Sequence, residues 1–346
     1  MSTTRLPIAR APSPDLPPLP REIQLEVTGA CNLRCAMCLV SYRPPLPRTS
    51  GSMPFETFRR VVDALPDLHT LTLQGIGEPL LAPDLLAMVE YAGSRGVRVG
   101  FNTNATLLGP EIAARLVDAG LAWLCVSLDG ARPATFESIR QGASFARVER
   151  NVRALVELMR ERGAALPELS LVFVAMRRNV AELADVVRLA AEWGVPRVRV
   201  QNLSHSFDDT DPAGAYREIR ELAAREALWP DADEEARAAF AEARLVAEER
   251  GVALRLPALG EGTRPRRAEG EPGCDWPWRS AYVRHDGKAQ PCCMLMGADR
   301  AILGDVRDRG FDEVWGGPSY RAFREALCGG DPPDVCRGCS MYRGVF

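Results

Sequence analysis

Residues 97–130 read VRVGFNTNATLLGPEIAARLVDAGLAWLCVSLDG. The alternation at 97–101 predicts a strand, and the apolar run at 122–128 predicts a second one. Between them, residues 110–119 begin with a proline and carry apolar side chains at helical spacing. Because a connection that holds a helix joins parallel strands rather than a hairpin, this stretch predicts one strand–helix–strand unit of a parallel sheet.

The same alternation of strands and helices continues on both sides of this stretch. Further strands are predicted at 23–27, 70–73, 169–175 and 197–201, and further helices at 54–65, 83–94, 133–139, 148–162 and 180–193. Six strands that alternate with helices indicate the α/β class. Polar motifs follow successive strands, and parallel folds place their sites at the carboxyl ends of strands. We therefore expect a partial (β/α)6, TIM-like barrel rather than an open, doubly wound sheet.

The composition outside this rhythm predicts a division into four parts. They are a Pro-rich N-terminal arm (1–20), the partial barrel (21–210), a helix and linker (211–273) and a small C-terminal domain (274–346). Within the third part, residues 214–250 predict an amphipathic helix and residues 258–273 are rich in Gly, Pro and charge. In the last part, Asp286-Gly287 predicts a hairpin turn, and residues 319–327 predict a helix.

Charge and hydropathy exclude several classes of protein. Lys and Arg number 43 against 46 Asp and Glu, a net charge of −3, which lacks the basic footprint of a nucleic-acid-binding protein. The sequence has no run of about 18 apolar residues that could cross a membrane. Its first residues show no apolar signal segment, so we predict a cytoplasmic protein without a membrane or nucleic-acid partner.

The ten cysteines fall largely into two clusters, which in a cytosolic chain indicates metal binding or catalysis. The first cluster, Cys31-x3-Cys35-x2-Cys38, directly follows the first predicted strand. Three thiolates can hold one side of an iron–sulfur cluster, and without a fourth ligand nearby one iron stays open to a reacting molecule. A structural zinc site is the alternative, although zinc prefers four ligands.

These cysteines and the motifs after the next strands resemble the signature of radical S-adenosylmethionine (SAM) enzymes. Gly75-Ile76-Gly77-Glu78-Pro79 is similar to the Gly-Gly-Glu-Pro segment of that family, with the glycine pair split. The segment after the third strand is similar to the family's Thr-Asn-Gly-Thr, with Ala105 in place of glycine. The resemblance implies that SAM is bound by Gly77, Glu78, Asn104, Ser127, Asp129 and Arg140.

The second cluster resembles the SPASM and twitch extensions of radical SAM enzymes. Its opening reads Cys274-x12-Gly287-x4-Cys292, and Cys336-x2-Cys339 closes it. Four cysteines imply one fully ligated [4Fe–4S] cluster, the twitch arrangement, with a spacing similar to that of the dehydrogenase of 2-deoxy-scyllo-inosamine. A four-cysteine zinc site is the alternative. Cys293 could replace Cys292, but the glycine spacing favours Cys292.

The resemblance implies an oxidoreductase with SAM and two [4Fe–4S] clusters as cofactors. A 5′-deoxyadenosyl radical would abstract a hydrogen atom from a small-molecule substrate, a sugar or aminocyclitol. The auxiliary cluster would accept an electron in the dehydrogenation, and a flavodoxin or ferredoxin would reduce the enzyme. A non-catalytic iron–sulfur carrier or zinc module would have no need of the SAM-binding motifs.

Two other reactions fit the same cofactors. A radical epimerase would need a thiol hydrogen donor, for which Cys328 and Cys293 are the candidates. A peptide-modifying enzyme is the second alternative, although only about 20 residues precede the first strand, too few for a separate leader-binding domain. His205 and Asp208 follow the sixth strand and are candidate catalytic residues, since either could accept a hydroxyl proton during oxidation.

Overall fold

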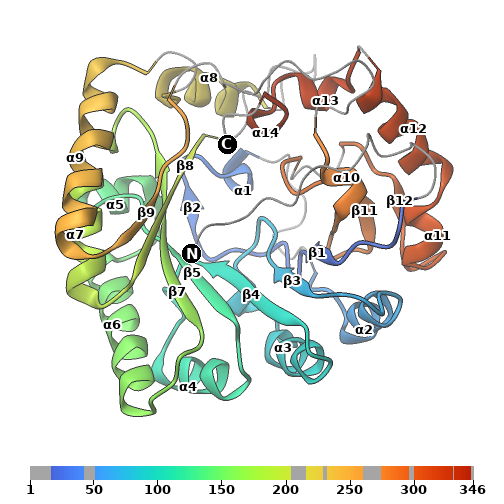
Figure 1. The fold of residues 1–346 in the computed structure, drawn as a ribbon, viewed down its shortest axis with the longest axis horizontal. Coiled ribbons are helices and arrows are strands. Elements are labelled where there is room, and N and C mark those ends of the chain that lie inside the picture. Colours follow the sequence, from blue (N-terminus) through green and yellow to red (C-terminus); the bar gives the residue numbers. More distant parts are fainter. Residues whose placement is uncertain are drawn as a thin grey trace.

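The computed structural model describes residues 17–42, 51–203, 216–228, 232–259, 274–295, 300–329 and 331–343. Its centre is one ten-stranded sheet in the order β12-β11-β10-β1-β3-β4-β5-β7-β8-β9. Figure 1 shows that this sheet curves, with helices on its outer side. The chain therefore has the mostly parallel α/β architecture of a partial barrel, as the sequence predicts.

The six strands predicted from the alternation form the middle of this sheet. Neighbours in the chain are neighbours in space, and every pair between them is parallel. They are β1 (Glu22–Leu25), β3 (Thr70–Leu73), β4 (Arg98–Thr103), β5 (Trp123–Ser127), β7 (Glu168–Ala175) and β8 (Arg197–Asn202). Their carboxyl ends therefore meet at one edge of the sheet.

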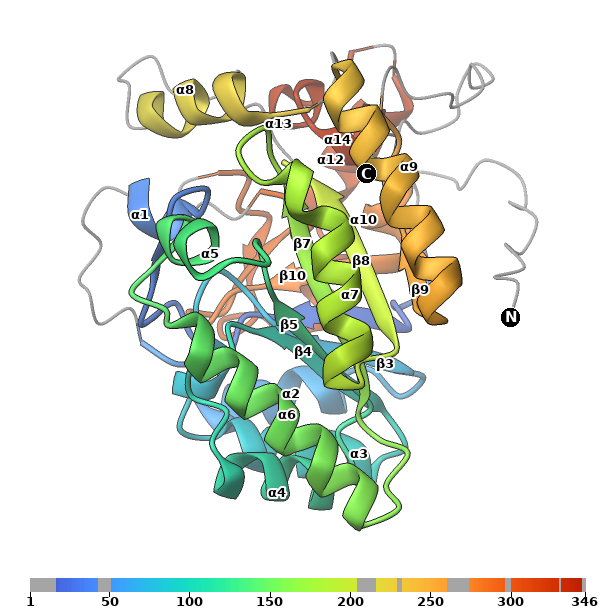
Figure 2. The same cartoon turned by 90° about the vertical axis from the view of Figure 1, so that its left-hand side faces the viewer.

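Helices connect these strands and pack their apolar faces on the outside of the sheet. They are α2 (Phe55–Asp63), α3 (Leu85–Ser94), α4 (Pro110–Asp118), α5 (Pro133–Ile139), α6 (Phe145–Glu161) and α7 (Leu183–Trp193). Proline begins α4 and α5, where its missing N–H costs no hydrogen bond. Gly194 ends α7 in the left-handed conformation. Figure 2 shows α6 and α7 side by side on the outer surface.

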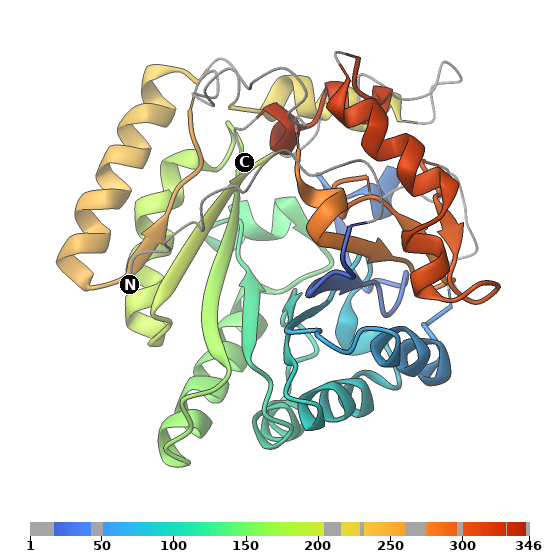
Figure 3. The ribbon, with the colours of Figure 1, turned by 45° about the vertical axis from the view of Figure 1, so that its right-hand side comes forward.

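Segments outside the predicted alternation extend the sheet at both ends. At one end β9 (Ala253–Arg255) pairs parallel with β8. At the other, β10 (Ser280–Val283) pairs parallel with β1, and β11 (Lys288–Gln290) and β12 (Gly304–Asp305) continue antiparallel. The C-terminal helices, red in Figure 3, lie on the β1 side of the sheet. The C-terminal part is therefore hydrogen-bonded directly to the first barrel strand.

The predicted hairpin turn at Asp286-Gly287 joins β10 and β11. Gly287 has φ of +81°, and a Cβ there would lie 2.6 Å from the side chain of Arg307. Only glycine adopts this backbone without strain and leaves room for the neighbouring side chain. This explains the glycine of the Cys274-x12-Gly287-x4-Cys292 spacing.

The prediction of one helix over residues 214–250 is wrong, because two helices occupy that stretch. They are α8 (Arg217–Glu226) and α9 (Glu234–Arg250). The backbone is extended at Ala227, which ends α8. The Asp233 side chain accepts a hydrogen bond from the backbone N–H of Ala236, which starts α9 anew. The helical spacing of apolar residues continues across the break between α8 and α9, so the sequence pattern did not reveal the break.

Short elements complete the described structure. They are β2 (Arg34–Cys35), α1 (Leu39–Tyr42), η1 (Pro79–Leu81), β6 (Arg140–Gln141), η2 (Val180–Glu182), α10 (Trp276–Arg279), α11 (Phe311–Trp315), α12 (Pro318–Cys328), α13 (Asp334–Arg337) and α14 (Ser340–Arg343). The helix predicted at 319–327 is confirmed as α12. Across the described ranges, no helix has both the length and the apolar character of a membrane span.

Candidate functional site

The first three cysteines lie in a compact loop between β1 and α1. Cys35 is 8% exposed, and Cys31 and Cys38 are partly buried. The backbone N–H of Cys38 donates to the carbonyl of Cys35 at 3.1 Å, and the N–H of Leu33 donates to Sγ of Cys31 at 3.5 Å. These bonds fold the loop tightly and keep the three thiols near one another.

The chemistry of these thiols suits a cationic cluster. Burial raises the pKa of Cys31 and Cys35 above the usual value and raises that of Cys38 to about 12. Neighbouring thiols add to the shifts of Cys31 and Cys38. The thiols therefore stay protonated unless a cation stabilises their ionised form. Bound metal does this by displacing the protons, and thiolates are the ligands that iron–sulfur clusters use.

The loop after β3 packs against the backbone that leads into the cysteines. A Cβ at Gly77 would lie 2.2 Å from the carbonyl oxygen of Thr28 and 2.6 Å from that of Ala30. The backbone N–H of Glu78 donates to the same Ala30 carbonyl at 2.8 Å. Glycine at position 77 is thus required for this close approach, which fixes the Gly-Glu-Pro segment beside the cysteine loop.

The Glu78 carboxylate joins the ends of β3 and β4. It is 3% exposed and accepts hydrogen bonds from Thr103 Oγ1 at 2.6 Å and from the backbone N–H of Asn104 at 2.8 Å. It also accepts from the N–H of Leu80, which caps η1. Burial raises the pKa of Glu78, while these donors favour its charged form. Both oxygens of Glu78 accept hydrogen bonds from the chain itself, so Glu78 holds this loop in position.

Asn104 connects the end of β4 to the cysteine loop. Its Nδ2 donates to Oδ1 of Asn32 at 3.0 Å, and its Oδ1 accepts from the hydroxyl of Thr106 at 2.6 Å. The next residue, Ala105, has φ of +57° and is fully buried. This left-handed conformation explains why the resembling family has glycine there, and hydrogen bonds to the Ala105 backbone hold it here.

Arg140 lies beside Cys35 and is held there by Asp129. Strand β6 pairs antiparallel with β2, so Arg140 is opposite Cys35, and its Nη1 lies 3.8 Å from Sγ of Cys35. Its Nε donates to Oδ2 of Asp129 at 2.7 Å, while Oδ1 of Asp129 accepts from the N–H of Val174. Both Asp129 oxygens are thus engaged. The guanidinium offsets thiolate charge and can offer remaining N–H groups to an anion.

The structure brings most of the predicted SAM-binding residues into one contact network with the cysteine loop. Ser127 ends β5, two residues before Asp129, and is partly exposed. The candidate catalytic residues His205 and Asp208 lie outside the described residues. The network members are Gly77, Glu78, Asn104, Asp129 and Arg140.

A second cysteine site lies in the C-terminal part. One cavity is lined by Cys274, Cys292, Cys336 and Cys339, the four predicted ligands, and its remaining lining is apolar or aromatic. The N–H of Cys339 donates to the carbonyl of Cys336 at 3.2 Å, the same turn that Cys38 makes with Cys35. Within the described residues, no three His, Cys, Asp or Glu side chains are arranged around a single metal ion. The four thiols instead surround a shared space.

Cys292 and its neighbour Cys293, and the isolated Cys328 and Cys125, have different surroundings. Burial raises the pKa of Cys292 well above its usual value and that of Cys293 to about 12, and the neighbouring thiols add to both shifts. Cys293 does not line the cavity. Cys328 ends α12 and packs beside the apolar cluster of Trp278 and Leu327. Its role as a hydrogen donor stays a prediction. Cys125 is 2% exposed within β5.

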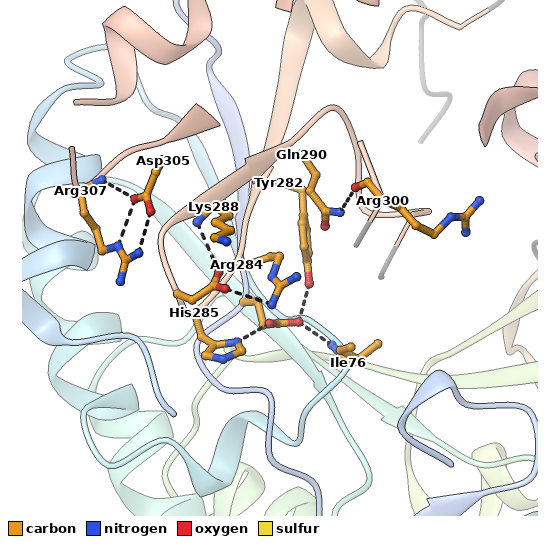
Figure 4. A network of polar contacts seen from close by, with 11 residues as sticks. Ile76, Tyr282, Arg284, His285, Lys288, Gln290, Arg300, Asp305 and Arg307 are labelled. Carbon is orange, nitrogen blue, oxygen red and sulfur yellow. Dashed lines mark hydrogen bonds and ion pairs between the residues drawn. The ribbon is translucent and has the colours of Figure 1, made fainter. Parts of the chain in front are cut away.

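Sequence reasoning missed Glu26, a buried carboxylate between the barrel and the C-terminal part. It is 1% exposed, and its Oε2 accepts from the hydroxyl of Tyr282 at 2.6 Å and the N–H of Ile76 at 3.2 Å. Its Oε1 lies 2.5 Å from Nδ1 of His285. Figure 4 shows Tyr282, His285 and Ile76 converging on this carboxylate. A Cβ at Gly75 would lie 2.2 Å from Cγ of Glu26, so glycine leaves the room it needs.

We predict that the hydrogen bonds of Glu26 contribute measurably to the free energy of unfolding. Glu26→Ala leaves the hydroxyl of Tyr282, the N–H of Ile76 and the ring of His285 without this buried partner, and we expect the free energy of unfolding to fall by about 3 kcal/mol. Tyr282→Phe removes one donor and should cost about 1 kcal/mol. Denaturant unfolding of the iron-free protein measures both. The matched control is Tyr91→Phe, which removes an exposed hydroxyl–carboxylate bond to Asp63. A loss in the control as large as that in Tyr282→Phe would contradict the prediction.

Two protein-family models match the chain. Residues 25–190 match the radical SAM superfamily, and residues 274–340 match the SPASM model, described as an iron–sulfur cluster-binding domain. The first match contains the three cysteines of the barrel and the network around them. The second contains all four cysteines of the C-terminal cavity.

Similar proteins span nearly the whole chain. The mycofactocin maturase MftC of Mycobacterium ulcerans is 29% identical over 325 residues, covering 92% of this chain and 79% of that protein. The AdoMet-dependent heme synthase of Methanosarcina barkeri is 28% identical, covering 92% and 91%. SuiB of Streptococcus suis, solved with precursor peptide SuiA, has the same fold, with a TM-score of 0.69 at 16% identity over 94% of this chain and 70% of SuiB.

Proposed function

We propose, from the premise that this chain is a radical SAM enzyme with a C-terminal iron–sulfur cluster-binding domain, that it modifies a peptide substrate. Its cofactors are SAM and a [4Fe–4S] cluster in the barrel, with further iron–sulfur in the C-terminal domain. The observation that carries the proposal is the similarity to a maturase over 92% of the chain. The fold shared with a structure that holds a precursor peptide supports it.

The residues of the barrel site would bind and orient the cofactors. Cys31, Cys35 and Cys38 would hold the first cluster, with the guanidinium of Arg140 next to Cys35. Arg140 would pair with the SAM carboxylate, and the backbone at Gly77 would approach its amino group. When bound, SAM and the reduced cluster supply one-electron chemistry that removes a hydrogen atom from the substrate. The buried hydrogen bonds of Glu78 and Asn104 keep the surrounding loops fixed.

The cysteines of the C-terminal cavity would hold the auxiliary cluster. Apart from Cys274, Cys292, Cys336 and Cys339, the side chains that line it are apolar or aromatic, which limits its contact with water. Low solvent exposure is one of the factors that set the potential of such a cluster. All four positions are cysteines, so this site would leave no iron open for SAM.

A substrate assay tests the proposal. The anaerobically reconstituted, dithionite-reduced enzyme is mixed with SAM and with short peptides encoded beside its own gene. We expect a peptide to raise the formation of 5′-deoxyadenosine about ten-fold over the rate without substrate. A bound substrate supplies the hydrogen atom that the 5′-deoxyadenosyl radical takes, whereas SAM cleavage without substrate is uncoupled. Mass spectrometry would show the same peptide with altered mass. An unchanged peptide, with stimulation by an aminocyclitol instead, would refute peptide modification.

Dehydrogenation of a sugar or aminocyclitol is the second candidate. One observation favours it: four cysteines line one cavity, as in the twitch arrangement that the sequence resembles. In the same assay, 2-deoxy-scyllo-inosamine would then be oxidised to a ketone, with one 5′-deoxyadenosine formed per turnover. The maturase similarity favours the peptide, so we place this reaction second.

A further inference from the structure

We propose that Arg199 and Arg255 form a binding site for a carboxylate group of the substrate on the inner face of the barrel. The proposal rests on the proposed function only for the identity of the molecule that carries the carboxylate. It follows from the register of four neighbouring strands and from the partners of the arginines on them.

The register places both arginines on the inner face at one level. Ser127 on β5 is opposite Val172 on β7, Val172 is opposite Arg199 on β8, and Arg199 is opposite Arg255 on β9. The residues that flank them along these strands, such as Val198, belong to the hydrophobic core beneath the helices. Because side chains alternate between the two faces, Arg199 and Arg255 point away from the helices and into the barrel.

This level coincides with the predicted SAM-binding edge. Ser127 ends β5 there, and the sequence resemblance implies that it contacts SAM. Arg199 is two strands from Ser127, or about 10 Å at the usual strand spacing. A group bound by Arg199 would therefore lie beside the cofactor within the same curved sheet.

Two arginines nearer the amino-terminal ends of the strands pair with a carboxylate, whereas Arg199 and Arg255 do not pair with one within the described residues. Two residues before Arg199, Arg197 pairs with Glu168 at 2.6 Å, and Arg98 pairs with the same carboxylate at 3.0 Å. Neither Arg199 nor Arg255 has a carboxylate partner within the described ranges of the chain. The contact found for Arg199 is between its Nη1 and Sγ of Cys125 at 4.0 Å.

That thiol does not neutralise Arg199. Burial raises the pKa of Cys125 above its usual value, so the thiol stays uncharged at neutral pH. Arg199 is only partly exposed, and a partly desolvated guanidinium without an anion is unfavourable. Arginine binds carboxylates through two parallel N–H bonds, which fits a carboxylate that bridges the two strands. A peptide offers such a group at its C-terminus or on Asp and Glu.

Chemical modification of the holoenzyme tests the site without turnover. Phenylglyoxal reacts with accessible guanidinium groups, and peptide mapping by mass spectrometry reports each arginine separately. We expect Arg199 and Arg255 to react faster than Arg98 and Arg197. At ten times its Kd, acetyl-trialanine with a free C-terminus should slow Arg199 and Arg255 about ten-fold by mass action. The C-terminal amide of the same peptide should give no protection.

Variants separate this site from a general effect of charge. In Arg199→Gln, we expect Arg255 to lose its protection by the free acid, and Arg199→Lys should restore it only in part. The matched control is Arg197→Gln, two residues away on the same face, which should leave protection unchanged. Retained protection of Arg255 in Arg199→Gln, or equal protection by acid and amide, would overturn the proposal. Circular dichroism of each variant confirms that it is folded.

Succinate is a third probe, which separates a failure of this proposal from a failure of the proposed function. Protection by succinate but by neither peptide would support a carboxylate site and refute a peptide as its occupant. Slow modification of Arg199 and Arg255 in the absence of any probe would show that the chain itself already pairs with them, and the proposal would fall.

Discussion

Replacing Cys31 by alanine is expected to abolish SAM cleavage. The cysteine loop supplies three thiols to the first cluster, and two thiols cannot hold a cluster that needs three. The N–H of Leu33, which donates to Sγ of Cys31, also loses its acceptor, so the loop itself loosens. Formation of 5′-deoxyadenosine by the reduced, anaerobic protein should fall to background. The iron content should fall from about eight to about four per chain.

The control for Cys31→Ala removes a thiol elsewhere. Cys125 lies within β5, outside both cysteine sites, so Cys125→Ala should retain about eight irons per chain. If Cys31→Ala kept both its iron and its SAM cleavage, the cysteine loop would not hold the reactive cluster. A wild-type protein with only about four irons would instead argue against the auxiliary cluster.

The strand–helix rhythm predicted the barrel because each unit carries its own local pattern. Strands β3, β4, β5, β7 and β8 have apolar runs bounded by helices with clear starts, such as the proline at the beginning of α4. At the two ends of the sheet, only the hairpin around Asp286-Gly287 had a local pattern, and its pairing with β1 was not predicted. Strand β9 is only Ala253–Arg255, and β10 pairs with β1 across more than 250 residues of sequence. Pairing over that separation depends on tertiary packing, which local periodicity does not report.

The site shows the same division between local and long-range information. Cys31, Gly77 and Arg140 stand in short motifs, and motifs of this kind are readable from sequence. The partners of Glu26 are not, because Ile76 and Tyr282 lie 50 and 256 residues away. A charged residue inside the apolar strand at 23–27 was the available signal, since a buried carboxylate must find donors. Likewise, only the register placed Arg199 beside Arg255.

Replacing Cys292 by alanine is expected to remove the auxiliary cluster and leave SAM cleavage intact. Cys292 lines the C-terminal cavity with three other cysteines, and its loss leaves the cluster short of one ligand. The barrel cysteines lie in a separate loop, so 5′-deoxyadenosine should still form after reduction. Iron should fall from about eight to about four per chain, and product formation should fall at least about a hundred-fold, since the auxiliary cluster no longer takes part in electron transfer.

The adjacent thiol provides the matched control for Cys292→Ala. Cys293 is partly buried, as Cys292 is, but does not line the cavity, so Cys293→Ala should keep about eight irons and full turnover. The opposite pattern, with iron lost from Cys293→Ala and retained in Cys292→Ala, would assign the ligand to Cys293. Adjacent residues cannot easily both bind one cluster, and this pair of variants decides which of the two thiols does. Product formed at the normal rate by a Cys292→Ala protein that lacks the auxiliary iron would refute an electron-transfer role for that cluster.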